Sequence, residues 1–215
     1  TPLYDVCEDT NGVNDFGTTT NAWAAWLGPR QPLAPNARLA TAARRHSRDM
    51  AETGLFQHNS PSSNYYPLGS TPLQRHTLEG YTNAVSGFYE NIAYGYQGYT
   101  GGYPAEGRSV SNVYEALFTD FTAANRGHRQ ASLNAVAREI GVGSFRTNGY
   151  SAPFYRTYDY DTEDFGRLST NHFFTDTVFF DANTNGLYDE GEGVSNVEVR
   201  LWRGTNEAAW YDRST

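Results

Sequence analysis

The segment from Asn36 to Gly54 is the part of the sequence that most restricts the fold. Asn36 is a typical first cap of a helix, because its side chain accepts hydrogen bonds from the first turn, and Gly54 suits the left-handed turn that ends one. Between them, positions that share one helix face recur at intervals of four, three and four residues. These positions form one stripe, made of Leu39, Ala43, His46 and Met50. The sequence therefore predicts a helix with one packed face. His46 lies on that stripe, so it is predicted to be a core histidine rather than a ligand.

The rest of the central region changes from helical to alternating patterns. A second helix is predicted from about Ser109 to Ala124, and a short third helix in HRQASLNAVA. Two strands, EIGVGSFR and APFYRTYDYD, follow, and DTEDFG closes the pattern. Helices followed by strands indicate an α+β arrangement of packed layers.

Residues 55–108 are predicted to be mostly loop, because glycine, proline and tyrosine are frequent there. The stretch GFYENIAYGYQGYTGGY is the densest in tyrosine and glycine. Such a composition can form a sugar- or peptide-binding surface. The favoured interpretation is that these aromatic side chains hold an irregular segment onto the core.

Composition excludes several classes of function. The net charge of −8 argues against a nucleic-acid surface, which needs a basic patch. All sixteen basic residues are Arg, so no lysine amine is available for Schiff-base chemistry. No apolar run is long enough for a membrane span, and TPLYDVCEDT does not look like a signal peptide. The single cysteine, Cys7, excludes an internal disulfide framework.

Five motifs occur in an order that points to one family. They are NARLATAARRHSRDM, GLFQHNSP, ENIAYG, GHRQASLN and REIGVGSF. Together they resemble the CAP superfamily, which includes cysteine-rich secretory proteins and bacterial SCP-like extracellular proteins. The resemblance covers about Asn21 to Gly166 and implies an α-β-α sandwich with a central cleft. It also implies a secreted or cell-surface protein.

The resemblance implies that the cleft holds two histidines and two acidic residues. Carried over by motif, these include His58 of FQHNSP, Glu90 of YEN and His128 of GHR. Tyr89 departs from the family pattern, which usually has glycine before the glutamate, and its ring would narrow the approach to the site.

The second acid has to be chosen between two residues of the second predicted helix. Asp120 lies in the middle of the apolar stripe of that helix, whereas Glu115 points about 200° away, toward solvent. Asp120 also follows the large apolar Leu117 by three residues, where the family places its acid after Trp. Asp120 is therefore the predicted fourth residue of the site.

The chemistry of this tetrad leaves several functions open. Two neutral imidazoles and two carboxylates can bind zinc or another divalent ion, or can form a hydrogen-bonded network that only braces the cleft. The predicted function is a secreted CAP-domain protein whose cleft binds a ligand, an extracellular partner or a divalent ion without catalysis. The alternatives are a metal-dependent hydrolase that uses the tetrad and a cell-surface adhesion module.

The stretch DANTNGLYDEGE, residues 181–192, has the spacing of a twelve-residue calcium loop, with glycine at position six. Strand-like TVFF and VEVRLW flank it instead of helices. This tail resembles the calcium-binding B-type repeats of bacterial surface proteins. The resemblance implies calcium ligands from Asp181, Asn183, Asn185, Leu187 (by its carbonyl), Asp189 and Glu192.

These patterns divide the chain into three parts. Residues 1–20 are predicted to be an irregular lead-in, residues 21–170 the CAP-like domain, and residues 171–215 a partial β-sandwich segment with the calcium loop. Residues 171–215 are too few to complete a seven-stranded sandwich, so the predicted role of calcium is to brace two strands. The predicted fold class is α+β, an α-β-α sandwich of CAP type with a C-terminal calcium-loop extension.

Overall fold

The computed structural model divides the chain into two compact units, Thr1–Phe173 and Phe174–Thr215. It describes residues 32–82, 84–103, 109–120, 127–168, 173, 178–184, 191–197, 201–203 and 206–209. The predicted lead-in at residues 1–20 and the short helix predicted at NAWAAWL lie outside the described residues.

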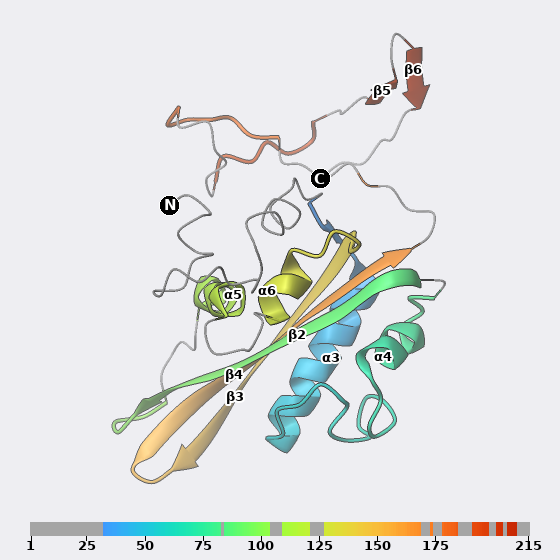
Figure 1. The fold of residues 1–215 in the computed structure, drawn as a ribbon. Coiled ribbons are helices and arrows are strands. Elements are labelled where there is room, and N and C mark those ends of the chain that lie inside the picture. Colours follow the sequence, from blue (N-terminus) through green and yellow to red (C-terminus); the bar gives the residue numbers. More distant parts are fainter. Residues whose placement is uncertain are drawn as a thin grey trace, which may run out of the picture. The chain divides into compact units, whose positions relative to one another are not determined.

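The first unit is built around one mixed sheet (Figure 1). Its elements are β1 (Ala34–Pro35), α3 (Ala37–Thr53), α4 (Pro72–Leu78), β2 (Ala84–Tyr99), α5 (Val110–Thr119), α6 (Gly127–Ser132), β3 (Glu139–Ser151) and β4 (Phe154–Leu168). The strand order is β1-β3-β4-β2, with β1 parallel to β3 and the other pairs antiparallel. Figure 1 shows α3 and α4 on one side of the sheet and α5 and α6 on the other, so the α+β prediction with helices on both faces is confirmed.

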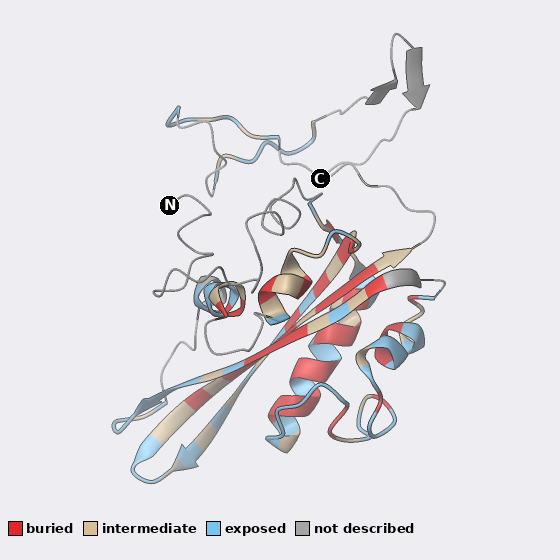
Figure 2. Cartoon of the chain, viewed as in Figure 1, coloured by how far each residue is buried: buried red, intermediate tan, exposed pale blue. Residues whose placement is uncertain are grey.

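Helix α3 begins and ends where the sequence predicts. The Asn36 side chain accepts hydrogen bonds from the backbone of Arg38 and Leu39, and Gly54 closes the helix at φ 70°. The predicted stripe is fully buried: Leu39, Ala43, His46 and Met50 are 0% exposed. Figure 2 shows these buried positions where α3 lies against the sheet.

Two glycines of β3 let α3 lie directly on the sheet. A Cβ atom at Gly141 or Gly143 would overlap the backbone of α3. The hydroxyl of Ser47 reaches across this narrow gap, with the Gly143 carbonyl oxygen at 3.0 Å and the Thr162 hydroxyl at 2.9 Å. The close approach fixes which face of the sheet α3 covers.

The prediction that residues 55–108 are mostly loop is wrong for its second half. Residues 84–99 form the sixteen-residue strand β2, which pairs with β4 from Tyr89 to Tyr99. The high glycine content suggested a loop, but the tyrosines between the glycines favour a strand, and pairing with β4 decides the outcome. Helix α4 also lies in this region, with Thr71 and Gln74 forming a capping box.

The other helices and strands predicted in the central region are present in the structure, and they differ from the prediction mainly in where they begin and end. Helix α5 ends at Thr119 rather than at Ala124, because Asp120 adopts the left-handed conformation at φ 48° and caps it. The two predicted strands are confirmed as β3 and β4. The stretch DTEDFG, which was predicted to close the strand pattern, is itself part of strand β4. No helix in the described part of the chain is long and apolar enough to cross a membrane.

The described part of the second unit includes both ends of the predicted calcium loop. Phe179 and Gly193 form an antiparallel bridge, and the amide of Phe180 donates to the Glu192 carbonyl at 3.0 Å. A separate strand pair, β5 (Leu201–Arg203) and β6 (Asn206–Ala209), follows. The predicted ligands Asn185, Leu187 and Asp189 lie outside the described residues.

Candidate functional site

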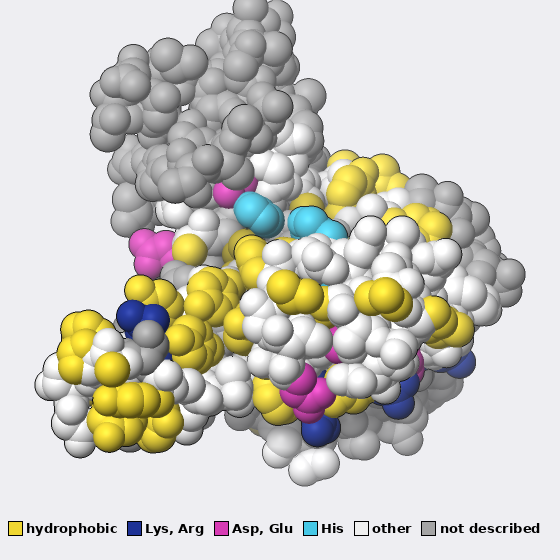
Figure 3. All heavy atoms as spheres, turned by 90° about the horizontal axis from the view of Figure 1, so that it is seen from below, with side chains coloured by type: hydrophobic (Ala, Val, Ile, Leu, Met, Phe, Trp, Pro, Cys, Tyr) yellow, Lys and Arg dark blue, Asp and Glu magenta, His cyan; other side chains and the backbone are white. Residues whose placement is uncertain are grey.

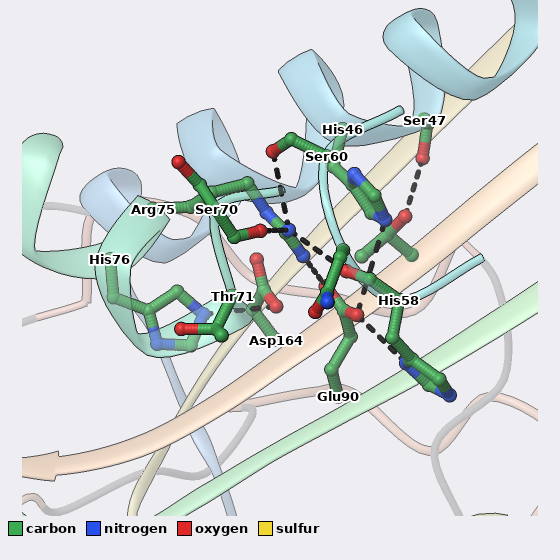
Figure 4. A network of polar contacts seen from close by, with 12 residues as sticks. His46, Ser47, His58, Ser60, Ser70, Thr71, Arg75, His76, Glu90 and Asp164 are labelled. Atoms are coloured by element: carbon green, nitrogen blue, oxygen red, sulfur yellow. Dashed lines mark hydrogen bonds and ion pairs between the residues drawn. The ribbon is translucent and has the colours of Figure 1, made fainter. Parts of the chain in front are cut away.

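Glu90, on strand β2, is the centre of the first histidine–acid pair. Its side chain is 1% exposed, and its Oε1 lies 2.9 Å from Nδ1 of His58. Its Oε2 forms an ion pair with the buried guanidinium of Arg75 from α4. His46 of α3 lies behind them, with Nε2 4.0 Å from Glu90 Oε1, so three elements meet at one carboxylate (Figure 4).

Arg75, which is not among the residues predicted from the motifs, connects several parts of this side of the site. Its Nη1 donates to the carbonyl oxygens of His58 and Ser70, both at 2.9 Å, while Nη2 reaches Glu90. The side chain is 0% exposed, and its charge is matched by Glu90. The capping box of Thr71 and Gln74 predicts that a helix starts at this point, so it is a sequence signal that could have placed Arg75 on a helix.

His46 is the core histidine that its place on the helical stripe predicted. Burial lowers the pKa of His46 to about 4, although the charge of Glu90 opposes this effect. The ring is therefore neutral at pH 7, and its Nε2 donates to the Gln57 carbonyl at 3.0 Å. A neutral ring in this position supports the loop that carries His58.

The second pair is formed by Asp120 and His128. Asp120 Oδ1 lies 2.8 Å from Nδ1 of the His128 ring, and Oδ2 accepts a hydrogen bond from the His128 backbone at 2.9 Å. Asp120 is 4% exposed, whereas Glu115, the other candidate, is exposed on α5. The helical angle used in the sequence argument does not apply, because Asp120 caps α5 instead of continuing it.

Consecutive residues of β2 reach the two pairs from opposite faces of the sheet. Glu90 faces α3 and α4, whereas the Asn91 side chain donates to the His128 carbonyl at 3.1 Å on the side of α6. Among the described histidines, His58 and His128 have side chains that reach solvent, with 54% and 31% of the side-chain surface exposed. Figure 3 shows exposed histidine side chains on one face of the molecule. Convergence of all four side chains in a single cleft stays a prediction.

A third histidine–acid contact, which sequence reasoning missed, lies beside the first pair. His76 Nε2 is 2.9 Å from Asp164 Oδ1, and both side chains are 0% exposed. Asp164 is the partner of Glu90 in the register of β2 and β4, so both carboxylates lie on the same face (Figure 4). Only the strand register reveals this neighbour, because residues 90 and 164 are far apart in the sequence.

The described residues do not form a ready metal site. Nowhere in the described part of the chain do three His, Cys, Asp or Glu side chains gather as ligands for one ion. In both exposed histidines Nδ1 already contacts a carboxylate, which leaves Nε2 as the atom that can bind something else. A zinc ion at the tetrad would therefore have to use the two Nε2 atoms and would need further ligands from elsewhere.

This order of helices and strands, with its two histidine–acid pairs, defines an α+β domain with a polar surface site. Residues 29–160 match CAP, the cysteine-rich secretory protein family. The match spans more than half of the sequence, so the chain belongs to the CAP family. Despite the name of that family, this sequence has one cysteine.

One solved structure illustrates which known proteins this chain is similar to. It is the 1.5 Å crystal structure of an extracellular protein containing a SCP domain from Bacillus anthracis str. Ames, with 24% sequence identity and a TM-score of 0.38. The similarity covers 60% of this chain and 34% of that chain, so it spans about a third of the other protein. The search of curated proteins gave no match.

Proposed function

We propose that this chain is a secreted CAP-domain protein whose histidine–acid pairs bind a ligand, an extracellular partner or a divalent ion without catalysis. The observation that carries this proposal is that each carboxylate oxygen of the two acids already contacts a partner within the protein. Glu90 is shared between His58 and Arg75, and both oxygens of Asp120 contact His128. A general base or a carboxylate nucleophile needs an oxygen that can reach the substrate.

The imidazole edges are the groups that remain available for binding. Each acid fixes the orientation of its ring through Nδ1, and Nε2 can then act as one donor or one acceptor toward a bound molecule. The half-exposed His58 and the partly exposed His128 suit recognition of a polar group at the protein surface. Orienting a ring in advance lowers the entropy cost of binding.

Zinc is a suitable probe for this site. Titration calorimetry with zinc chloride at pH 7.5, with calcium present to occupy the acidic tail loop, should detect weak binding. Binding should weaken at pH 5.5, because a metal binds only the neutral imidazole and protons compete with it for the ring nitrogen. His58→Asn and His128→Asn should each reduce the zinc affinity. Equal zinc affinity at both pH values would exclude the histidines as ligands.

The hydrolase alternative has a different signature. If the tetrad were catalytic, wild-type protein with zinc would hydrolyse ester or peptide substrates, and both His58→Asn and His128→Asn would remove that activity. The binding proposal expects no turnover above the buffer rate in any of these samples. An adhesion module would instead keep its surface binding in both histidine variants.

We also propose that the tail loop binds one structural calcium ion. The ligands would come from Asp181, Asn183, Asn185, Leu187, Asp189 and Glu192. The antiparallel bridge between Phe179 and Gly193 supports a strand–loop–strand arrangement around residues 181–192. The Glu192 carboxylate is also near the start of the loop, since its Oε1 accepts a hydrogen bond from the Ala182 amide at 3.0 Å. Calcium would neutralise the acids that crowd this turn.

A further inference from the structure

An exposed aromatic surface covers the free end of the long strands, apart from the histidine–acid pairs. Tyr94 and Tyr96 of β2 pair in register with Tyr160 and Tyr158 of β4, so all four rings lie on the face that α3 covers further along. The ring centroids of Tyr94 and Tyr160 are 4.9 Å apart, and those of Tyr96 and Tyr158 are 5.7 Å apart. Tyr160 is buried with the core, whereas Tyr94 and Tyr96 are 38% and 52% exposed.

Further residues extend this surface in both directions. The ring centroids of Phe56 and Tyr94 are 5.8 Å apart, and Phe56 is 47% exposed. Phe154, which is 41% exposed, extends the row of aromatic residues along β4. We call this set the aromatic face, and it consists of Phe56, Tyr94, Tyr96, Phe154, Arg156 and Tyr158. Figure 3 shows hydrophobic side chains gathered over the projecting end of the sheet, with an Arg side chain among them. The interpretation that these aromatic side chains only hold a loop onto the core is therefore wrong.

Two glycines allow side chains of the aromatic face to lie flat against the sheet. Gly98 of β2 and Gly149 of β3 stand on either side of Arg156 in the strand register. A Cβ atom at Gly149 would lie 3.0 Å from the Tyr158 ring, and one at Gly98 would lie 3.5 Å from the Arg156 side chain. The ring and the arginine stem therefore lie over bare backbone, which leaves flat faces toward solvent.

The charge of this region is opposite to that of the whole chain. Residues 94–103 and 145–158 contain two arginines and no Asp or Glu, although the protein carries a net charge of −8. Arg146 is paired with Asp159 at 2.7 Å. The Arg156 guanidinium lies over rings instead, 5.0 Å from the Tyr96 centroid and 5.8 Å from that of Phe154. The aromatic face thus has one cation next to stacked rings.

We propose that the aromatic face binds an acidic oligosaccharide, with sugar rings on the tyrosines and a sugar carboxylate on Arg156. The flat face of an aromatic ring attracts the weakly positive C–H groups of a sugar, and tyrosine adds a hydroxyl at its rim. A guanidinium binds a carboxylate through two parallel hydrogen bonds while it stays stacked on a ring. Both kinds of contact are present within one row of residues.

The composition favours a sugar over a protein partner. Residues 94–103 and 145–158 contain no Val, Leu, Ile or Met. Thr147, the partner of Tyr158 in the register of β3 and β4, places a hydroxyl on the same face as the Tyr158 ring. A protein interface usually has an apolar core that packs as closely as a protein interior. A surface of tyrosine, glycine and small polar residues suits the mixed apolar and hydroxyl character of a sugar chain.

Titration calorimetry with a hexamer of galacturonic acid tests this proposal, with maltohexaose as the neutral comparison. The full chain should bind the acidic hexamer more tightly. Tyr96→Ala should weaken that binding roughly two- to tenfold, from the usual worth of one aromatic contact, whereas Tyr96→Phe should keep most of it. Arg156→Gln should remove the preference for the acidic sugar over the neutral one.

Two substitutions outside the aromatic face serve as controls. Tyr114→Ala removes an exposed tyrosine of α5, and Arg44→Gln removes an exposed arginine of α3, so both should leave binding unchanged. Absence of binding, or equal losses in Arg44→Gln and Arg156→Gln, would overturn the proposal. Sedimentation that shows self-association of the wild type but not of Tyr96→Ala would also overturn it, because a second copy would then occupy the face.

Discussion

Glu90 and Asn91 are neighbours on strand β2 and hold the two histidine–acid pairs from opposite faces of the sheet. Glu90 Oε1 contacts His58 on the side of α3 and α4, whereas Asn91 Nδ2 donates to the His128 carbonyl on the side of α6. The alternation of side chains along a strand makes this division of roles possible with two consecutive residues. Strand β2 is also an edge strand, so elements from both faces can meet beside it.

The first prediction concerns Asn91, which is 1% exposed and also donates to Ser132 Oγ at 3.2 Å and Glu163 Oε2 at 3.0 Å. Asn91→Ala should lower the free energy of unfolding by about 1–3 kcal/mol, because buried acceptors lose their donor. Urea denaturation would measure the change. Asn64→Ala, in an exposed loop, is the matched control and should change stability little. A similar stability for both variants would mean that Asn91 does not anchor α6.

The second prediction concerns the buried ion pair of Arg75 and Glu90. Arg75→Met should destabilise the fold by roughly 3–5 kcal/mol, because Glu90 keeps a buried charge that no longer has its partner. Adding Glu90→Gln to Arg75→Met should recover part of the loss, since the remaining charge is then gone. A double-mutant cycle of unfolding free energies measures the coupling. Strictly additive losses would contradict a direct interaction.

The third prediction follows from the lowered pKa of His46, about 4 because of burial. The unfolded chain binds a proton on this ring near pH 6.5 and the folded chain only near pH 4, so the folded state loses stability as the pH falls through that range. The loss from His46 should reach about 3 kcal/mol and level off below pH 4. Urea denaturation of wild type and His46→Gln at several pH values isolates this contribution. If the difference in unfolding free energy between wild type and His46→Gln did not vary with pH, the proposed contribution of His46 would be wrong.

The fourth prediction concerns the proposed calcium site in the tail. Glu192→Gln keeps the shape of the side chain but removes a carboxylate, so calcium affinity should fall strongly. Calcium at a hundred times its dissociation constant should stabilise the wild-type tail by about 2.7 kcal/mol, because it binds only the folded loop. Thermal melts with calcium and with chelator, together with calcium calorimetry, measure both effects. Glu207→Gln is a control outside residues 181–192 and should leave calcium affinity unchanged. Identical melting temperatures of the wild type with calcium and with chelator would mean that residues 181–192 are an ordinary acidic turn.

Local signals in the sequence were sufficient for the elements that depend on near neighbours. The caps of α3, its buried stripe and the core position of His46 all follow from residues within a few turns of one another. The motifs around His58, Glu90 and His128 were likewise sufficient to predict the family. Asp120 was chosen on a helical angle, but its contact with His128 depends on a left-handed cap that the helical pattern does not contain.

The residues that complete the site are far apart in the sequence and are brought together by the packing of the fold. Short-range spacing was enough to predict the helix from Ala37 to Thr53 and the family motifs. The strand character of β2 and the contact of Arg75 with Glu90 depend on residues brought together by pairing with β4 and by the packing of α4. The same register turned a tyrosine- and glycine-rich stretch into an exposed aromatic face. Strand pairing is a long-range interaction, so one strand alone does not specify its partner, its register or the face that remains open to solvent.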